Sequence, residues 1–138
     1  MTQEEKQLLL KDLCGRLQYY KLQVQYNDKD WLVIGYAHER IELLSNSTIL
    51  GPCPLIKDVK PYLRPMSNMT EKEKKVLNGL IYNKEGVRTS STPVWAINES
   101  DIGGYVDFCN SHFLDWRGLI PMGLALEAPE GMYKIEKL

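Results

Sequence analysis

The segment "HFLDWR", residues 112–117, gathers the densest set of chemically useful side chains in this 138-residue sequence. His112, Asp115 and Arg117 have the types that serve as general base, orienting carboxylate and anion holder, and Trp116 adds a stacking surface. The same residues also suit a helix end, because a histidine there interacts favourably with the helix dipole and an aspartate caps the next helix. We favour this structural interpretation, and a small hydrolase that uses His112 and Asp115 is the alternative.

Cys109 and His112 are three residues apart, a spacing that lets both face one side of a helix and bind zinc. A structural zinc site needs four ligands in most cases, so His38 and Cys14 or Cys53 would have to converge from the other half of the chain. A cysteine on an apolar helix face is usually a core residue. We therefore expect a buried thiol, no metal and no other cofactor.

A basic segment surrounds "VKPYLRPMSNMTEKE", residues 59–73. Its cations would meet phosphates and its tyrosine would stack on a base if the protein bound nucleic acid. These residues are Lys57, Lys60, Tyr62, Arg64, Lys72, Lys74 and Lys75. Acidic side chains alternate with them at Asp58, Glu71 and Glu73, which is typical of a solvated face. A nucleic-acid-binding module is therefore an alternative and not the leading hypothesis.

Composition is that of an ordinary globular protein, with 43% hydrophobic and 25% charged residues. The formal charge of −1 provides no global field that would draw the chain to nucleic acid or to an anionic membrane. The sequence contains no signal peptide and no membrane-spanning stretch, and its three cysteines cannot all pair, so we expect reduced thiols in the cytoplasm. It also lacks a phosphate loop, a nucleophile elbow and the Cys-x-x-Cys and His-Glu-x-x-His motifs, so an enzyme is the less favoured class.

The first half of the sequence predicts a helix followed by short strands. A capping box at Thr2 and Glu5 and leucines at helical spacing indicate a helix over residues 3–14. The period then changes to two in "KLQVQY" and "WLVIGY", which the turn "NDKD" joins into a hairpin. "RIELL" and "STIL" suggest a further pair, and "LIKDVKPY" a closing edge strand. We expect a small, curved antiparallel sheet, with an SH3-like barrel as one form of it.

The second half predicts helices. Pro61 and Pro65 exclude helix and make residues 59–69 a stiff connector, and a second capping box at Thr70 and Glu73 starts a helix. A polar loop over residues 83–92, a helix that ends near His112 and a short helix over residues 116–120 follow. The chain is therefore predicted to be α+β, with a helix-plus-sheet subdomain over residues 1–66 and a helical subdomain over residues 67–138.

Three segments resemble an uncharacterised family of small proteins from prophages and mobile elements of gut anaerobic bacteria. They are "LLLKDLC" (residues 8–14), "VKPYLRPMSNMTEKE" (residues 59–73) and "DFCNSHFLDWRGLIPMGLALEAPEGMY" (residues 107–133). The family carries no established activity, so the resemblance implies a setting and not a mechanism. Where such proteins have two adjacent histidines, this chain has Ser111 and His112, which argues against a metal site there.

The leading hypothesis is a non-catalytic protein- or ligand-binding accessory protein of a phage or mobile element. Its sheet half is rich in aromatic residues, which suits a binding surface as well as a core: Tyr19, Tyr20, Tyr26, Trp31 and Tyr36. The expected ligand-binding residues are Tyr62, Arg64, His112, Asp115, Trp116 and Arg117. The expected partner is a protein or a small molecule, with nucleic acid less favoured and no membrane. An anti-defence protein that sequesters a signalling nucleotide or a host protein is a further alternative.

Overall fold

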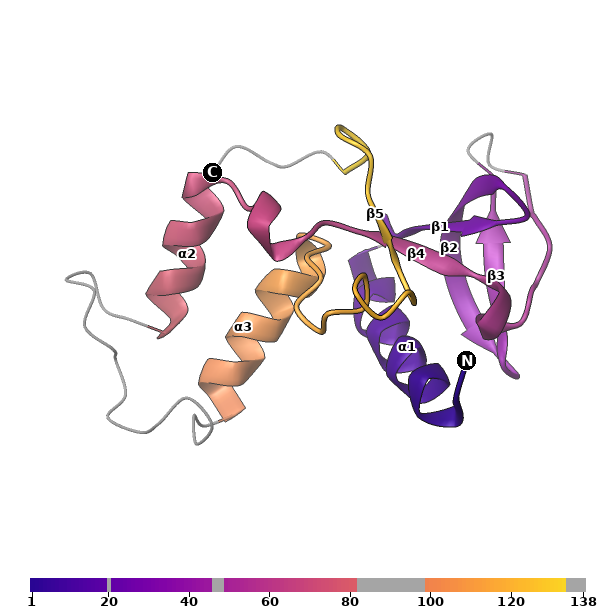
Figure 1. The fold of residues 1–138 in the computed structure, drawn as a ribbon, viewed down its shortest axis with the longest axis horizontal. Helices are drawn as coiled ribbons and strands as arrows, with labels where there is room; N and C mark the ends of the chain where they lie inside the picture. The colour runs from indigo at the N-terminus through magenta and orange to yellow at the C-terminus, as the bar shows by residue number, and fades with distance from the viewer. Residues whose placement is uncertain (20, 46–48, 82–98, 134–138) are drawn as a thin grey trace.

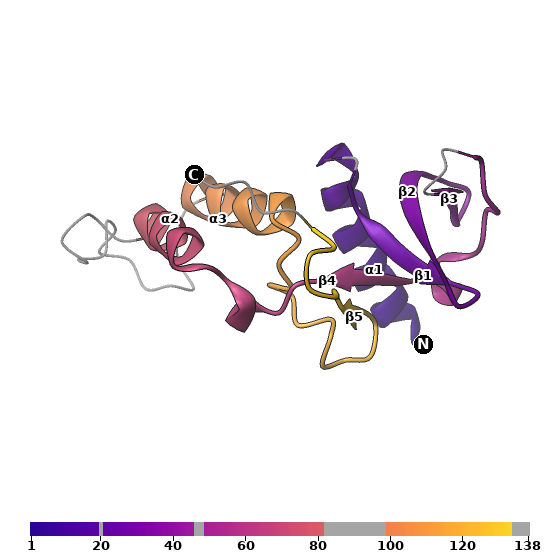
Figure 2. The same cartoon turned by 90° about the horizontal axis from the view of Figure 1, so that it is seen from above.

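A computed structural model describes residues 1–19, 21–45, 49–81 and 99–133. Its helices and strands are α1 (Gln3–Arg16), β1 (Gln23–Tyr26), β2 (Lys29–Ala37), β3 (Arg40–Leu44), β4 (Lys60–Leu63), α2 (Glu71–Ile81), α3 (Glu99–Ser111) and β5 (Leu126–Glu127). Three short 3-10 turns, η1 (Leu17–Tyr19), η2 (Ile56–Asp58) and η3 (Met66–Asn68), connect them. The molecule is elongated, with the curved sheet at one end, α2 and α3 side by side at the other, and α1 between them (Figures 1 and 2).

α1 begins at the predicted capping box. The Thr2 hydroxyl accepts a hydrogen bond from the Glu5 N–H (3.1 Å), and the Glu5 carboxylate accepts one from the Thr2 N–H (2.8 Å). The helix was predicted to end at residue 14, before Gly15, but it continues through this glycine. It reaches Arg16, whose guanidinium pairs with Asp12 one turn earlier and so stabilises the last turn.

Both hairpins turn through two residues. Asn27 and Asp28 join β1 to β2 with φ angles of 56° and 61°, and His38 and Glu39 join β2 to β3 with φ angles of 51° and 63°. Positive φ at both central residues is the mark of a type I′ turn, whose twist matches that of the flanking strands. The hairpin predicted around "NDKD" is confirmed.

The five strands form an open, mixed sheet in the order β3-β2-β1-β4-β5. β4 is not the predicted closing edge, because β5 pairs with it in parallel at Tyr62↔Leu126 and Leu63↔Glu127. The N–H of Ala128 extends this pairing with a hydrogen bond to the Leu63 carbonyl (2.8 Å). The α+β class is thus confirmed, whereas the wholly antiparallel sheet and the SH3-like barrel are wrong. The backbone groups of β4 find their second set of partners in the C-terminal half of the chain and not in a barrel seam.

An irregular segment covers the free edge of β3. The Ile41 N–H donates to the Pro54 carbonyl (2.8 Å), and the Gly51 N–H donates to the Leu43 carbonyl (2.9 Å). Pro52 and Pro54 have no N–H, so the segment makes isolated bridges and no regular strand. Of the strand predicted at "STIL", residues 47–50, residues 47 and 48 lie outside the described residues.

α2 starts at the second predicted capping box. The Glu73 N–H donates to the Thr70 hydroxyl (3.1 Å), and the Thr70 N–H donates to the Glu73 carboxylate (2.9 Å). No α-helix passes through Pro61 or Pro65 in the described segment before it, as predicted. α3 ends at Ser111, close to the predicted end, and the loop predicted over residues 83–92 lies outside the described residues.

The short helix predicted over residues 116–120 is wrong. This segment consists of turns, and its Gly118 has a φ of 77°, a left-handed conformation that a helix cannot continue. The helical half that the sequence predicts therefore contains α2 and α3, and after them an irregular segment that carries β5.

The main hydrophobic core lies between α1 and one face of the sheet. Leu9 and Leu13 of α1 are buried there together with apolar side chains of β1, β2, β3 and β4. Phe113, Leu119 and Tyr133 join the same core from the last part of the chain. A second, smaller cluster centres on Cys109 and Leu114, and Met66, Met69, Tyr105, Phe108 and Trp116 pack against it. Residues from both predicted subdomains thus contribute to the main core.

Candidate binding pocket and the polar joint beside it

Arg64 follows β4 and is only 5% exposed. Its guanidinium donates to both carboxylate oxygens of Glu73 (2.8 and 2.7 Å) and to the His112 carbonyl (3.1 Å). It also donates to the side-chain oxygen (3.2 Å) and the backbone carbonyl (3.3 Å) of Asn68. A guanidinium has five N–H donors, so all of them bind acceptors within the chain. Arg64, predicted to contact a ligand, ties the end of β4 to η3, α2 and the residue after α3.

We call Arg64 and the residues that it binds, Asn68, Glu73 and His112, the polar joint. Glu73 is the buried anion of this joint, with a side chain that is 1% exposed. Burial alone raises the pKa of Glu73, but hydrogen bonds from Arg64 and from the Thr70 backbone, the charge of Arg64 and a contact with His112 together lower it to about 2. Nδ1 of His112 lies 2.8 Å from the Glu73 carboxylate, and the imidazole ring stacks on Phe108 at 4.2 Å. Glu73 therefore stays ionised and joins the start of α2 to the end of α3.

A second buried arginine binds carbonyl groups at the end of α3 and just after it. Arg16 of α1 is 0% exposed and donates to the Leu114 carbonyl (2.7 Å) and the Cys109 carbonyl (3.4 Å). Arg64 binds the His112 carbonyl in the same region. The last carbonyl groups of a helix carry partial negative charge and have no partner within the helix. Here Arg16 binds one carbonyl of the last turn, that of Cys109, and the two guanidinium groups bind the carbonyls of Leu114 and His112 just after the helix.

Phe113 ends α3 in a left-handed conformation, with φ 57°. The Phe113 N–H donates to the Asn110 carbonyl (3.2 Å), and the Leu114 N–H donates to the Cys109 carbonyl (2.9 Å). This pair of bonds is the Schellman pattern, in which glycine is the usual left-handed residue. Burial of the Phe113 ring, stacked on Tyr133 at 4.3 Å, offsets the strain of that conformation.

Trp116 and Arg117 lie together beside α1. The Arg117 guanidinium lies 4.1 Å from the centre of the Trp116 ring, and its Nε is 3.3 Å from the Asp12 carboxylate that also pairs with Arg16. The Trp116 N–H donates to the Asn110 side chain (2.9 Å). These contacts hold the segment after α3 against α1.

Asp115 and Tyr62 make separate structural contacts. The Asp115 carboxylate accepts hydrogen bonds from the Leu119 N–H (2.7 Å) and the Ile120 N–H (2.9 Å), and so caps a turn where the sequence predicted the start of a helix. The Tyr62 hydroxyl donates to Asp30 (2.7 Å), at the far end of the first hairpin. Of the six predicted ligand-binding residues, the structure thus brings Arg64 and His112 together through Glu73 and stacks Arg117 on Trp116. It does not gather all six around one space.

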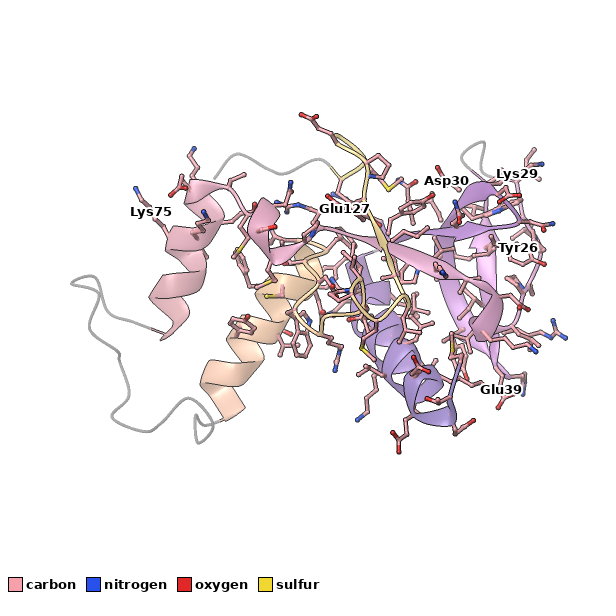
Figure 3. The ribbon with its side chains drawn as sticks, viewed as in Figure 1. Tyr26, Lys29, Asp30, Glu39, Lys75 and Glu127 are labelled. Atoms are coloured by element: carbon pink, nitrogen blue, oxygen red, sulfur yellow. The ribbon has the colours of Figure 1, made fainter. Side chains whose placement is uncertain are left out.

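A polar pocket of about 470 Å³ opens beside the joint. Two segments line it, one from β4 to the start of α2 and one from β5 onward, and they comprise Arg64, Asn68, Thr70, Glu127, Ala128, Pro129, Glu130, Gly131 and Tyr133. Figure 3 shows Glu127 at the middle of the molecule, between the helix pair and the sheet. This volume is within the range of small-molecule sites, which form preferentially where two substructures meet.

The charges of the pocket are acidic. Glu127 and Glu130 are exposed carboxylates at its wall, and Asn68 and Thr70 add uncharged polar groups. Among the described residues that line the pocket, Arg64 is the only cation, and the Glu73 carboxylate pairs with it. The unpaired charge of these described residues is therefore negative.

Tyr133 fixes one wall of the pocket to the sheet. Its hydroxyl donates to the Tyr62 carbonyl of β4 (2.8 Å) and accepts from the Gln23 N–H of β1 (2.9 Å). Burial raises the pKa of Tyr133, so the hydroxyl remains protonated. The pocket wall is thus tied to two strands by one side chain.

The cysteines do not gather with the histidines. Cys109 is buried, and burial raises the pKa of its thiol to about 11, whereas Cys14 and Cys53 are exposed. Among the described residues, no group of three or more histidine, cysteine, aspartate or glutamate side chains is placed to hold a metal ion.

Comparisons of the chain with family models, with curated proteins and with solved structures found no match. Within the described part of the chain, none of the helices has both the length and the apolar character of a membrane span.

Several residues of the joint and the pocket were not predicted. Asp12 and Arg16 fall on the same face of α1 as Leu9 and Leu13, and this 9-12-13-16 spacing is a signal that two charged residues are buried. Glu73 was interpreted as part of a solvated face, because its partner Arg64 precedes the helix. The sequence gives no sign that four other residues line a common pocket, because they meet only when β5 pairs with β4: Asn68, Thr70, Glu127 and Glu130.

Proposed function

We propose that this chain is a non-catalytic binding protein that holds a ligand or a segment of a partner protein in the pocket between residues 64–70 and 127–133. The observation that carries the proposal is a ligand-sized concavity with several polar groups converging on it, placed where the sheet meets the helix pair. Its walls are held by Arg64 and by the Tyr133 hydroxyl, so the site is preformed.

The hydrogen bonds and ion pairs of three carboxylates support a binding role over catalysis. Glu73 binds Arg64, Asp115 caps a turn, and Asp12 pairs with Arg16. A general base or nucleophile needs a reactive atom directed at a substrate. These three carboxylates are instead used to join elements of the fold.

The setting that we propose is the cytoplasm of a bacterium that carries a prophage or mobile element, where this chain acts as an accessory protein. The support for it is the resemblance of three segments to proteins of such elements. The described residues that line the pocket all lie in two of these segments, residues 59–73 and 107–133.

A pocket-filling substitution tests the proposal. Wild type, Ala128→Trp and Ala37→Trp would each be purified from a native host and analysed by mass spectrometry for retained proteins and small molecules. Ala128 lines the pocket, whereas Ala37 is exposed at the end of β2, so the second variant controls for an added indole. We expect a species that wild type and Ala37→Trp retain and Ala128→Trp loses. Equal retention by all three proteins, with equal melting temperatures, would contradict the pocket as the binding site.

A further inference from the structure

The charges and hydrogen bonds of the pocket beside the joint indicate which kind of ligand it would bind. This inference rests on the proposed binding function. Arg64, the only cation among the described residues that line it, has all five N–H donors bound to Glu73, His112 and Asn68. A phosphate or carboxylate bound in proteins typically relies on a free guanidinium fork or a comparable set of donors. To bind an anion, Arg64 would have to break buried bonds, so the pocket does not offer it.

The groups with free acceptor capacity are two carboxylates. Glu127 and Glu130 present them at the exposed wall, whereas the Asn68 side-chain oxygen already accepts from Arg64 and the Thr70 hydroxyl oxygen already accepts from the Glu73 N–H. A carboxylate accepts hydrogen bonds and favours a positively charged donor. Since both carboxylates remain in contact with water, they need no buried counterion within the chain.

We infer that the group bound in this pocket is a protonated amine or a guanidinium. Two sources share this chemistry, a lysine or arginine side chain of a partner protein and a free polyamine. The cavity of about 470 Å³ is large enough for such a group together with part of the chain that carries it. A nucleotide phosphate is the ligand that this charge distribution disfavours.

The test is a titration followed by amide chemical shifts. ¹⁵N-labelled protein would be titrated with three probes in separate experiments. The probes are spermidine, ATP, and a short peptide whose only charged side chains are one arginine and one lysine. We expect the amide signals of Thr70, Ala128 and Gly131 to shift with the peptide or with spermidine and not with ATP. A shift with the peptide alone identifies a protein side chain as the ligand group, and a shift with spermidine alone identifies a polyamine.

Charge-neutral variants supply the matched control. The double variant Glu127→Gln, Glu130→Gln should weaken the binding of the cationic probe roughly tenfold, because two partly exposed ion pairs are lost. The double variant Glu4→Gln, Glu39→Gln removes two exposed carboxylates away from the pocket and should leave the affinity unchanged. Figure 3 shows the separation of Glu39 from Glu127.

The outcomes separate this inference from the proposed function. Shifts at the pocket amides with ATP alone would overturn the cationic ligand and leave a binding site in place. No shift with any of the three probes, or equal affinity of the Glu127→Gln, Glu130→Gln variant, would also overturn the inference. The Ala128→Trp comparison then decides the proposed function independently.

Discussion

The hydroxyl of Tyr133 links two strands that lie side by side in the sheet. It replaces a direct bond between the Gln23 N–H of β1 and the Tyr62 carbonyl of β4, and its bond to the Tyr62 carbonyl is buried. A buried backbone group that loses its partner costs more than the net value of a typical hydrogen bond, because nothing restores its lost hydration.

Tyr133→Phe should therefore lower the free energy of unfolding by about 1–3 kcal/mol, while the ring keeps its stacking on Phe113. Urea denaturation measures this. Tyr62→Phe is the control, because the Tyr62 hydroxyl binds the side chain of Asp30, which regains water when the bond is lost. A Tyr133→Phe protein as stable as Tyr62→Phe would contradict the bridging role.

Glu73 gives the stability a defined dependence on pH. Its pKa is lowered from 4.5 to about 2 in the folded protein, so the folded state binds fewer protons than the unfolded state between these values. Its contribution to stability is fully present above about pH 4.5 and is lost as the pH falls through about 2. The shift corresponds to a contribution on the order of 3 kcal/mol at neutral pH. The Glu73→Gln variant should be less stable than wild type at pH 7, and its stability should fall less steeply than that of wild type below pH 4.5. Urea denaturation of both proteins at several pH values measures this, and parallel pH profiles of stability would contradict it.

At the scale of elements, the two hairpins contain turns that their residues fit imperfectly. Type I′ turns favour glycine at the second central position, where this chain has Asp28 and Glu39 with φ angles of 61° and 63°. A non-glycine residue in the left-handed region is under steric strain.

Asp28→Gly should raise the free energy of unfolding by up to about 1 kcal/mol, because relief of the strain at φ 61° exceeds the added entropy of the unfolded chain. Thermal unfolding would show this as a rise in the melting temperature of about 2–4 °C. Asp28→Ala removes the same carboxylate but keeps a side chain at the strained position, so it should not stabilise the protein. A rise of equal size in both variants would assign the effect to charge and not to the turn.

Elements with a local signal were predictable, and those formed by distant pairing were not. The capping boxes at Thr2 and Thr70 and the "NDKD" turn depend on neighbouring residues, and the structure contains all three. β5 has two residues in a segment without periodicity, so only its pairing with β4 defines it. The candidate site was missed for the same reason, because the pocket forms between segments that are remote in sequence.

At the scale of the whole molecule, two buried arginines connect the sheet end to the helix end. Arg16 comes from α1 and Arg64 from the end of β4, and both bind carbonyl groups around the end of α3. Arg64 also binds Glu73 of α2 and Asn68 of η3, so this single side chain joins the end of the sheet to both helices. Lysine keeps the charge at such a position but cannot supply the planar set of five donors.

Arg64→Lys should therefore loosen the helix pair without unfolding the hairpins. Thiol labelling measures this: in wild type, Cys14 and Cys53 should react while buried Cys109, with a pKa of about 11, is protected. In Arg64→Lys, the labelling rate of Cys109 should rise roughly a hundredfold, in line with the loss of a buried ion pair. The rate at Cys53, on the segment that covers β3, serves as the internal control. An unchanged rate at Cys109 would show that Arg64 is not needed to hold the boundary closed.

The parallel pairing of β4 with β5 also sets an order of events during synthesis. Leu63 precedes its partner Glu127 by 64 residues, and a ribosome adds about 5–20 residues per second. The nascent chain therefore carries β4 without its outer neighbour for roughly 3 to 13 s, while unpaired strand edges are prone to join other chains. Lys60 and Pro61 at the start of β4 are residues that discourage such pairing, since one is charged and the other has no N–H to donate. Emergence of β5 from the exit tunnel then lets the chain pair this edge of β4 itself.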